Sequence, residues 1–242
     1  MLFLIKSLML YKGESQICKG GVYKLVRRKK KGFLLALSLL TAFVFWTALV
    51  GVVDVKPIGP QNSKVGFATL NAFFCNVIGT NMFLYILTDW LGLVPIAVAV
   101  GFGILGLLQW MKCKSIRKVD GDILALGLFY IVVIFVYILF ECVVINCRPV
   151  LIEGCLEASY PSSTTMLVAT VMPTAAMQMH KRIKNGTTRR VVVLAVNIFT
   201  AFMVICRLLS GVHWLSDIIG GLLFSAGGVC LYRQVLFLWK RK

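Results

Sequence analysis

Long apolar stretches constrain the fold of this 242-residue sequence more than any other feature. A helix needs roughly 17–25 mostly apolar residues to cross the ~30 Å hydrocarbon core of a bilayer, where helices satisfy all of their backbone hydrogen bonds internally. Stretches of this length lie at about 33–53, 92–111, 122–146, 163–180, 191–208 and 216–238. Because 59% of the residues are hydrophobic and only 14% are charged, we predict an all-α membrane protein rather than a soluble globular domain.

A further apolar stretch, at about 66–90, suits a lipid-facing span poorly. The residues that interrupt it are Asn71, Asn76, Gly79, Asn81 and Asp89. We therefore expect a bundle of six transmembrane helices with an additional interfacial or re-entrant segment at 66–90. The alternative is a seventh crossing, but an odd number of crossings would disrupt the distribution of charge.

The basic residues that give a net charge of +17 are distributed unevenly along the chain. Of the 26 Lys and Arg residues, 22 lie in four places: 1–32, 111–121, 181–190 and the end of the chain from Arg233. Six crossings place all four on one side of the membrane, which the positive-inside rule identifies as cytoplasmic. We therefore expect cytoplasmic termini, and anionic lipid headgroups rather than nucleic acid as the partners of these charges.

The chain divides into a basic cytoplasmic segment at 1–32 and a single membrane domain at 33–242. The first apolar stretch has no small-residue cleavage site after it, so we expect a retained anchor rather than a removed signal peptide. Eight cysteines occur without Cys-x-x-Cys spacing or a histidine cluster, which predicts neither a zinc site nor a redox pair. Cys147 and Cys155 share an expected outer loop, and whether they pair stays open.

Polar residues gather where three of the expected spans meet the outer surface. Only four Lys or Arg residues remain for that side: Lys56, Lys64, Arg148 and Arg207. Arg148 follows the third span and Arg207 ends the fifth. The sequence "YPSSTT" at 160–165 opens the fourth span, and His213 and Asp217 open the sixth. These helix ends bring two arginines, a hydroxyl-rich helix start and a His/Asp pair to one surface.

Such a set of side chains is suited to phosphoryl chemistry. Guanidinium groups match phosphate oxygens, and the free N–H groups of a helix that starts after Pro161 attract an anion. His213 and Asp217 are spaced i, i+4 and lie on one helix face. The carboxylate can accept from one ring nitrogen and leave the other free to attack phosphorus. We therefore predict transfer through a phosphohistidine, with no metal ion and no cofactor.

The same residues carry a family resemblance. The segment "CRLLSGVHWLSD" at 206–217 resembles the third motif of the type 2 phosphatidic acid phosphatase family: Ser-Arg, five residues, His, three residues, Asp. "RP" at 148–149 resembles the end of the first motif, which is Lys, six residues, Arg-Pro. "PSST" at 161–164 resembles the second motif, Pro-Ser-Gly-His. The three segments occur in the same order as the motifs of the family. Their positions relative to the six expected helices also resemble the layout of the family.

This resemblance implies the following site. His213 is the nucleophile and Asp217 its orienting partner, while Arg148, Arg207 and the backbone of Ser162 and Ser163 bind the phosphate. Family substrates are mostly lipid phosphates and diphosphates, handled on the outer-leaflet side. We therefore expect a multi-pass hydrolase of the plasma membrane, with an extracytoplasmic active site surrounded by membrane lipids.

Three motif positions depart from the family pattern. Glu141 stands where the first motif has Lys, so an anion replaces a phosphate-binding cation. Thr164 stands where the second motif has the His that serves as general acid, and Cys206 replaces the Ser before Arg207. His180 is no substitute for that acid, because it lies about 24 Å along the same expected helix from Thr164, towards the cytoplasm.

The missing acid affects two classes of lipid phosphate differently. A phosphomonoester expels an alkoxide, for which general acid catalysis is worth about 10²–10⁴-fold. A lipid diphosphate expels a lipid monophosphate, which leaves without a proton. The sequence therefore predicts a phosphatase that prefers a polyprenyl-type diphosphate.

Alternatives to this prediction stay open. Glu141 or Glu157 is a possible replacement proton donor, since apolar surroundings raise the pKa of a carboxyl group. A carboxylate beside the phosphate also suits a cationic head group, as in a phosphotransferase that moves phosphocholine or phosphoethanolamine between lipids. A third reading is a homologue that binds a lipid phosphate or a protein partner without turnover. Retention of the Arg, His and Asp set favours an enzyme.

Overall fold

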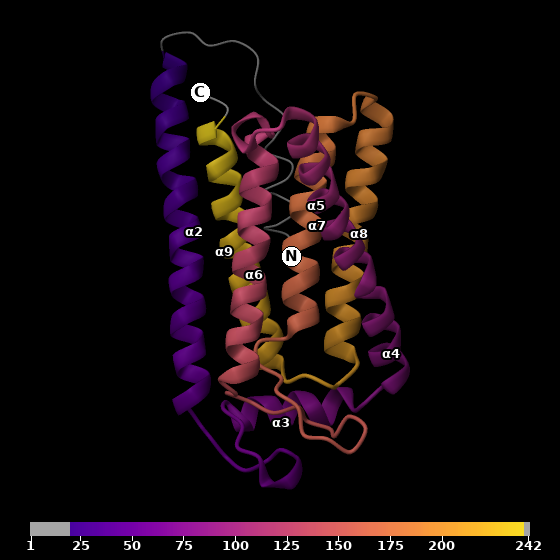
Figure 1. Ribbon diagram of the computed structural model, residues 1–242. Coiled ribbons are helices and arrows are strands. Elements are labelled where there is room, and N and C mark those ends of the chain that lie inside the picture. Colours follow the sequence, from indigo (N-terminus) through magenta and orange to yellow (C-terminus); the bar gives the residue numbers. More distant parts are fainter. Residues whose placement is uncertain (1–19, 240–242) are drawn as a thin grey trace.

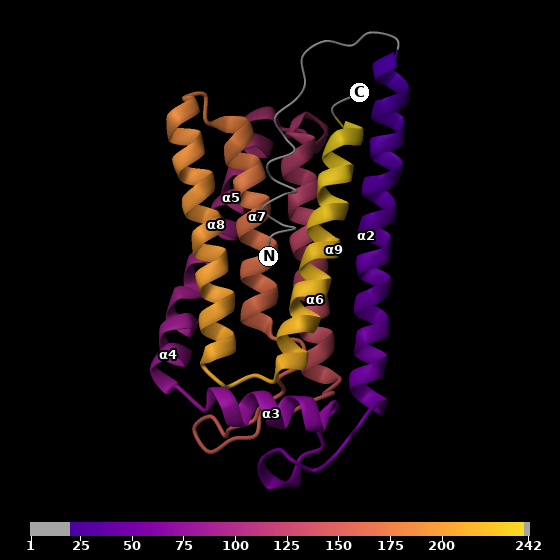
Figure 2. The ribbon, with the colours of Figure 1, turned by 180° about the vertical axis from the view of Figure 1, so that it is seen from behind.

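The computed structural model describes residues 20–239, which form a bundle of α-helices with no strand among them. The helices are α2 (Gly20–Val52), α3 (Ala68–Ile78), α4 (Met82–Leu91), α5 (Leu93–Cys113), α6 (Gly121–Cys142), α7 (Ser163–Arg182), α8 (Gly186–Leu209) and α9 (Leu215–Trp239), with short 3-10 turns at Pro60–Asn62 and Ile116–Lys118. The long helices run side by side, and α3 lies across one end of the bundle (Figures 1 and 2). Residues 1–19, most of the expected segment 1–32, lie outside the described residues.

Several of these helices are long and apolar enough to cross a membrane. Within residues 20–239 there are five candidate spans: Lys30–Val52, Met82–Cys113, Gly121–Cys142, Gly186–Leu209 and Leu215–Phe237. Large apolar side chains are exposed along them, as lipid contact requires. The prediction of an all-α integral membrane protein is confirmed.

The stretch expected as the fourth crossing forms α7, which is not among the five candidate spans. With 20 residues, α7 is about 30 Å long, and it packs against α5, α8 and α9 in the middle of the bundle. Its buried face carries Thr170, Thr174 and Gln178. Polar residues are tolerated there because α7 contacts protein rather than lipid. The count of six crossings stays a prediction.

The expected interfacial segment at 66–90 forms two helices with different positions. Only α3 lies across the end of the bundle (Figure 2). After Gly92, α4 leads directly into α5, so the second candidate span begins at Met82 rather than at about residue 92. The expectation of a single interfacial segment was therefore wrong for α4. Asn81 explains part of the polar content, because its side chain accepts the Leu84 N–H and caps α4.

The two ends of the bundle differ in charge. The α5–α6 and α7–α8 connections lie at the same end as the start of α2 and the end of α9 (Figure 1). Ion pairs at this end join Lys181 to Asp122 at 2.8 Å and Arg182 to Asp120 at 3.2 Å. The other end holds α3 and the connections 143–162 and 210–214. The basic loops and the motif segments thus lie at opposite ends.

Close packing joins the second-motif loop to α9 and α2. The hydroxyl groups of Tyr160 and Thr47 lie 2.7 Å apart. A Cβ atom added to Gly220 would lie only 2.7 Å from the Tyr160 ring, so this glycine permits the contact. Phe43 also packs edge-on against Phe224. These contacts fix the helix ends on which the motif residues stand.

Gly211 provides a test of how tightly the loop before His213 is packed. Its φ is +67°, and a Cβ atom would lie 1.9 Å from the carbonyl oxygen of Gly79. Gly154 also has a positive φ, +79°, but open space around it. We predict that Gly211→Ala lowers the unfolding temperature in detergent much more than Gly154→Ala, which bears only the left-handed backbone cost of about 1–2 kcal/mol. Equal shifts for the two variants would contradict this packing.

Candidate active site

His213 and Asp217 meet at the junction of the α8–α9 connection with α9. The Asp217 side chain is fully buried, and its Oδ2 accepts the Trp214 backbone N–H at 3.0 Å. The same oxygen lies 3.8 Å from Nδ1 of His213, which is longer than a hydrogen bond. The sequence-predicted pair therefore faces one another without a hydrogen bond between the two side chains.

The His213 ring is buried, and neither of its nitrogens has a hydrogen-bond partner. Burial, followed by the positive charges of Arg207 and Arg148, holds the pKa of His213 well below its usual value of 6.5. The imidazole is therefore neutral at physiological pH. A neutral imidazole is the form that can attack an electrophile.

Arg148 lies in the α6–α7 connection and is held by Glu157. The Arg148 Nε is 2.9 Å from Glu157 Oε2, and the Arg148 backbone N–H donates to the Glu157 carbonyl at 3.0 Å. Glu157, rather than the motif residue Glu141, is thus the partner of Arg148. The Arg148 Nη1 is buried without a hydrogen-bond partner.

Arg207 lies in the last turn of α8 and is almost completely buried. Its Nη1 donates to Thr88 Oγ1 at 3.2 Å and lies 4.0 Å from Asp89 Oδ1. The Nε of Arg207 has no hydrogen-bond partner. Two of the residues that hold this arginine thus come from α4, a helix that the motifs do not include.

The Tyr85 ring of α4 faces both arginines. Its centroid lies 5.0 Å from Cζ of Arg207 and 5.7 Å from Cζ of Arg148. Both distances are within the range of a cation–π attraction. Tyr85 therefore offsets part of the repulsion between two guanidinium groups that converge on one site.

The second-motif residues form the start of α7. Ser162 is buried as the residue before the helix, and its hydroxyl donates to Thr165 Oγ1 at 3.0 Å. Ser163 and Thr164 occupy the first turn and are half-buried. The first N–H groups of such a turn have no partner within the helix, so the predicted anion site at this position stays a prediction. Thr164 places a hydroxyl, not an imidazole, at the position of the family's general acid.

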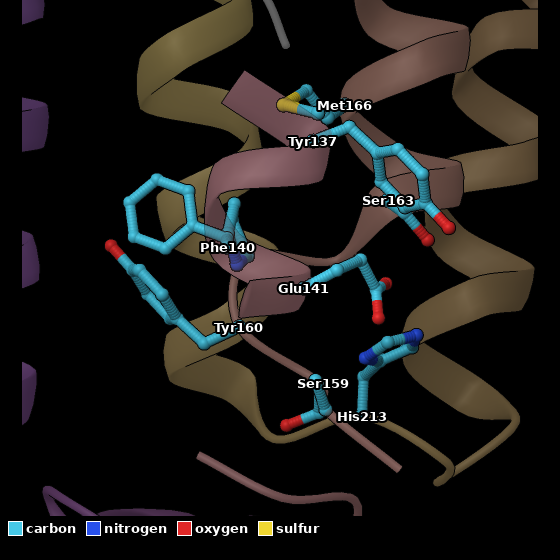
Figure 3. A pocket seen from close by; sticks show the side chains of 10 residues that line it. Tyr137, Phe140, Glu141, Ser159, Tyr160, Ser163, Met166 and His213 are labelled. Atoms are coloured by element: carbon cyan, nitrogen blue, oxygen red, sulfur yellow. The ribbon is translucent and has the colours of Figure 1, made fainter. Parts of the chain in front are cut away.

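A small cavity lies between His213 and the end of α6. Tyr137, Glu141, Ser159 and Ser163 are among the residues that line it. The Glu141 carboxyl group is directed towards the His213 ring, although the residue is otherwise exposed (Figure 3). The cavity volume of about 10 Å³ is sufficient for about one water molecule. A phosphoryl group would therefore have to displace side chains.

Sequence reasoning missed the residues that surround Asp217 and the arginines. Asn71 of α3 and Asn146 of the α6–α7 connection are buried and bonded into the site. The sequence offered one signal for these two residues: each is a side-chain amide within an otherwise apolar stretch, which indicates a buried hydrogen-bonding role. Cys147 and Cys155 are both free. Among residues 20–239, no group of three His, Cys, Asp or Glu side chains is placed to hold a metal ion.

Comparisons with known proteins agree with the motif resemblance. A family model described as the PAP2 superfamily matches residues 122–241, which contain all three motif segments. A similar fold occurs in the crystal structure of the first transmembrane PAP2 type phosphatidylglycerolphosphate phosphatase from Bacillus subtilis. Its TM-score is 0.54 at 19% identity, over 86% of this chain and 97% of the other. A search of curated proteins gave no match.

Fold and motif order thus define a membrane-embedded member of a phosphatase superfamily. The chain belongs to the PAP2 superfamily, which confirms the predicted relation to type 2 phosphatidic acid phosphatases.

The contact between Tyr85 and the arginines predicts an effect on anion binding. Tyr85→Leu removes the ring, so the two guanidinium groups are held less closely, and we expect inorganic phosphate to bind about fivefold or more weakly. Tyr85→Phe keeps the ring and should bind phosphate like the wild type. Isothermal titration of the purified proteins measures both. Equal weakening in the two variants would show that the hydroxyl group, rather than the ring, is responsible.

Proposed function

We propose that this protein is a membrane-integral lipid phosphatase that hydrolyses a polyprenyl-type lipid diphosphate through a phosphohistidine. One observation carries the proposal: buried N–H groups of Arg148 and Arg207 lack hydrogen-bond partners beside the buried His213 ring. Buried polar groups are nearly always paired, so these donors await a ligand. An anion with several acceptor oxygens, such as a phosphoryl group, suits them best.

The proposed reaction has two steps. Nε2 of His213 attacks the terminal phosphorus, an N–P bond forms, and the P–O bond to the lipid phosphate breaks. The electron pair leaves with the lipid monophosphate. Water then attacks the phosphohistidine, the N–P bond breaks, and inorganic phosphate is released as the imidazole is restored.

The surrounding residues have distinct tasks in this scheme. Arg148, Arg207 and the N–H groups at Ser162 and Ser163 stabilise the charge on the phosphoryl oxygens, which supplies most of the catalysis in phosphoryl transfer. Asp217 faces Nδ1 of His213, and would keep the proton on that nitrogen. Nε2 is then left with the lone pair that attacks.

The preference for a diphosphate follows from the leaving group. Thr164 cannot protonate an alkoxide, and Glu141 is exposed rather than buried in apolar surroundings. A lipid monophosphate needs no proton to depart. A diphosphate therefore loses little from the missing general acid, whereas a monoester such as phosphatidate loses the full contribution.

We also propose that the site faces the outside of the cell membrane. The basic connections lie at the end of the bundle opposite the site, and such connections are retained in the cytoplasm. This orientation includes α7 as a sixth crossing and places both termini in the cytoplasm. The lipid phosphate would then be presented by the outer leaflet of the plasma membrane.

Two other functions share the same site. Glu141 lines the cavity beside His213, which suits a cationic head group and hence a phosphotransferase. The pairing of Arg148 with Glu157 and the small cavity suit a protein that binds a lipid phosphate without turnover. The buried, neutral imidazole that faces Asp217 favours hydrolysis over both.

Phosphate release from a panel of lipids tests the proposal. Purified protein should hydrolyse a polyprenyl diphosphate at least 100-fold faster than phosphatidate, because only the monoester needs an acid. His213→Ala should abolish release, since it removes the nucleophile. His180→Ala, which changes the other histidine at the opposite end of the bundle, should keep activity.

The remaining outcomes separate the alternatives. Equal rates for the two lipids, or faster monoester cleavage, would contradict the diphosphate preference. Transfer of a labelled head group to a lipid alcohol would identify a phosphotransferase. Binding of the lipid phosphate without release, in wild type and His213→Ala alike, would identify a binding protein.

A further inference from the structure

We infer that Asn146 is a positioning residue for the reaction: its side-chain amide holds one carboxylate oxygen of Asp217 so that the other oxygen faces His213. The inference rests on the proposed function of this site. Asn146 occupies one of the six unspecified positions of the first motif, two residues before Arg148. No motif of the family resemblance includes it.

The two oxygens of the Asp217 carboxylate have separate partners. Oδ1 accepts from Asn146 Nδ2 at 3.2 Å and from the Ser216 hydroxyl at 3.3 Å. Oδ2 accepts the Trp214 backbone N–H and is the oxygen nearest His213 Nδ1. Rotation of the carboxylate would move Oδ2 away from the imidazole. The contacts to Oδ1 resist this rotation.

The orientation of the Asn146 amide is itself determined by its partners. Its Oδ1 accepts the Gly66 backbone N–H at 3.0 Å, so the NH₂ group must face Asp217 and Ser216. The Asn146 carbonyl oxygen also accepts the Ser159 N–H at 2.9 Å. The residue thus joins the 53–67 connection, the α6–α7 connection and α9.

Asn71 supports the same arrangement from α3. Its Nδ2 donates to Ser216 Oγ at 2.9 Å, and its Oδ1 accepts the Ser216 N–H at 3.2 Å. The Ser216 hydroxyl therefore has two incoming donors and directs its own proton to Asp217. Because Asn71, Asn146 and Asp217 are all buried, water cannot replace a lost hydrogen bond.

Asn146→Asp isolates the donor function of the amide. The new carboxyl group has the same shape and still accepts the Gly66 N–H, but it donates to Asp217 only while it carries a proton. Two carboxyl groups in one buried site share a proton up to near-neutral pH and repel one another once both are ionised. The Asn146→Asp variant can therefore donate a hydrogen bond to Asp217 at low pH but not at high pH.

Other ionisable groups near Asp217 do not obscure this test. Cys147, Tyr160 and His213 face the carboxylate, and Arg148 and Arg207 face the histidine. Burial, and then the Asp217 charge, raises the pKa of Cys147, and burial raises the pKa of Tyr160. The pKa of His213 is lowered. Cys147, Tyr160 and His213 are therefore neutral between about pH 6.5 and 8.5.

The experiment measures kcat and KM for the polyprenyl diphosphate across this pH range. In Asn146→Asp we expect kcat to fall about 10- to 100-fold at the alkaline end, the range for one hydrogen bond to a charged group, and to recover towards wild type as the pH falls. KM should change less than threefold, since the phosphate ligands are intact. Asn185→Asp makes the same change at the far end of the bundle, where either residue caps α8, and should match wild type.

The possible results distinguish the inference from a structural role and from the proposed function. A ratio of variant to wild-type kcat that is constant with pH would overturn the inference. If Asn146→Asp does not fold, Asn146→Ser tests the inference instead. A lower kcat with unchanged KM would support a positioning role for Asn146. Parallel losses of activity and unfolding temperature would contradict that role. A wild-type protein without activity on the lipid panel would overturn the proposed function and this inference together.

Discussion

The carboxylate of Asp217 is the group on which the arrangement of the site depends. It is completely buried at the start of a helix, so every acceptor site must be satisfied by the protein itself. Its partners come from α9, from the preceding loop and from the α6–α7 connection. Satisfying this one group brings the first-motif loop and the third-motif helix together, and it places His213 between them and the arginines.

The second constraint is the burial of two guanidinium groups beside a neutral imidazole. Like charges in a poorly solvated site repel one another, and the chain reduces this cost with Glu157, Thr88 and the Tyr85 ring. These partners leave some N–H groups of each arginine unused. Burial, and then the same positive charges, lower the pKa of His213 and keep it neutral. The charges that suit anion binding thus also help to keep the nucleophile in its reactive form.

Sequence reasoning predicted the parts of the structure that local patterns determine. Apolar length identified the lipid-facing helices, and motif spacing identified Arg148, Arg207, His213 and Asp217 as residues at one end of the bundle. It misjudged α4, which leads directly into α5 instead of lying at the interface. The crossing by α7 stays a prediction, because hydropathy reports contact with lipid and α7 contacts mainly protein. Asn71 and Asn146 were missed because their partners lie about 70 to 145 positions away in the chain, and such separations appear only after folding.

The central claim is that one imidazole faces an anion held by two arginines. A structure of the purified protein with orthovanadate, a mimic of the phosphoryl group in transfer, tests this most directly. The account predicts vanadium bonded to Nε2 of His213, with Arg148 and Arg207 contacting its oxygens and Asp217 hydrogen-bonded to Nδ1. Vanadate bound elsewhere, or a His213 ring turned away from both arginines, would contradict it.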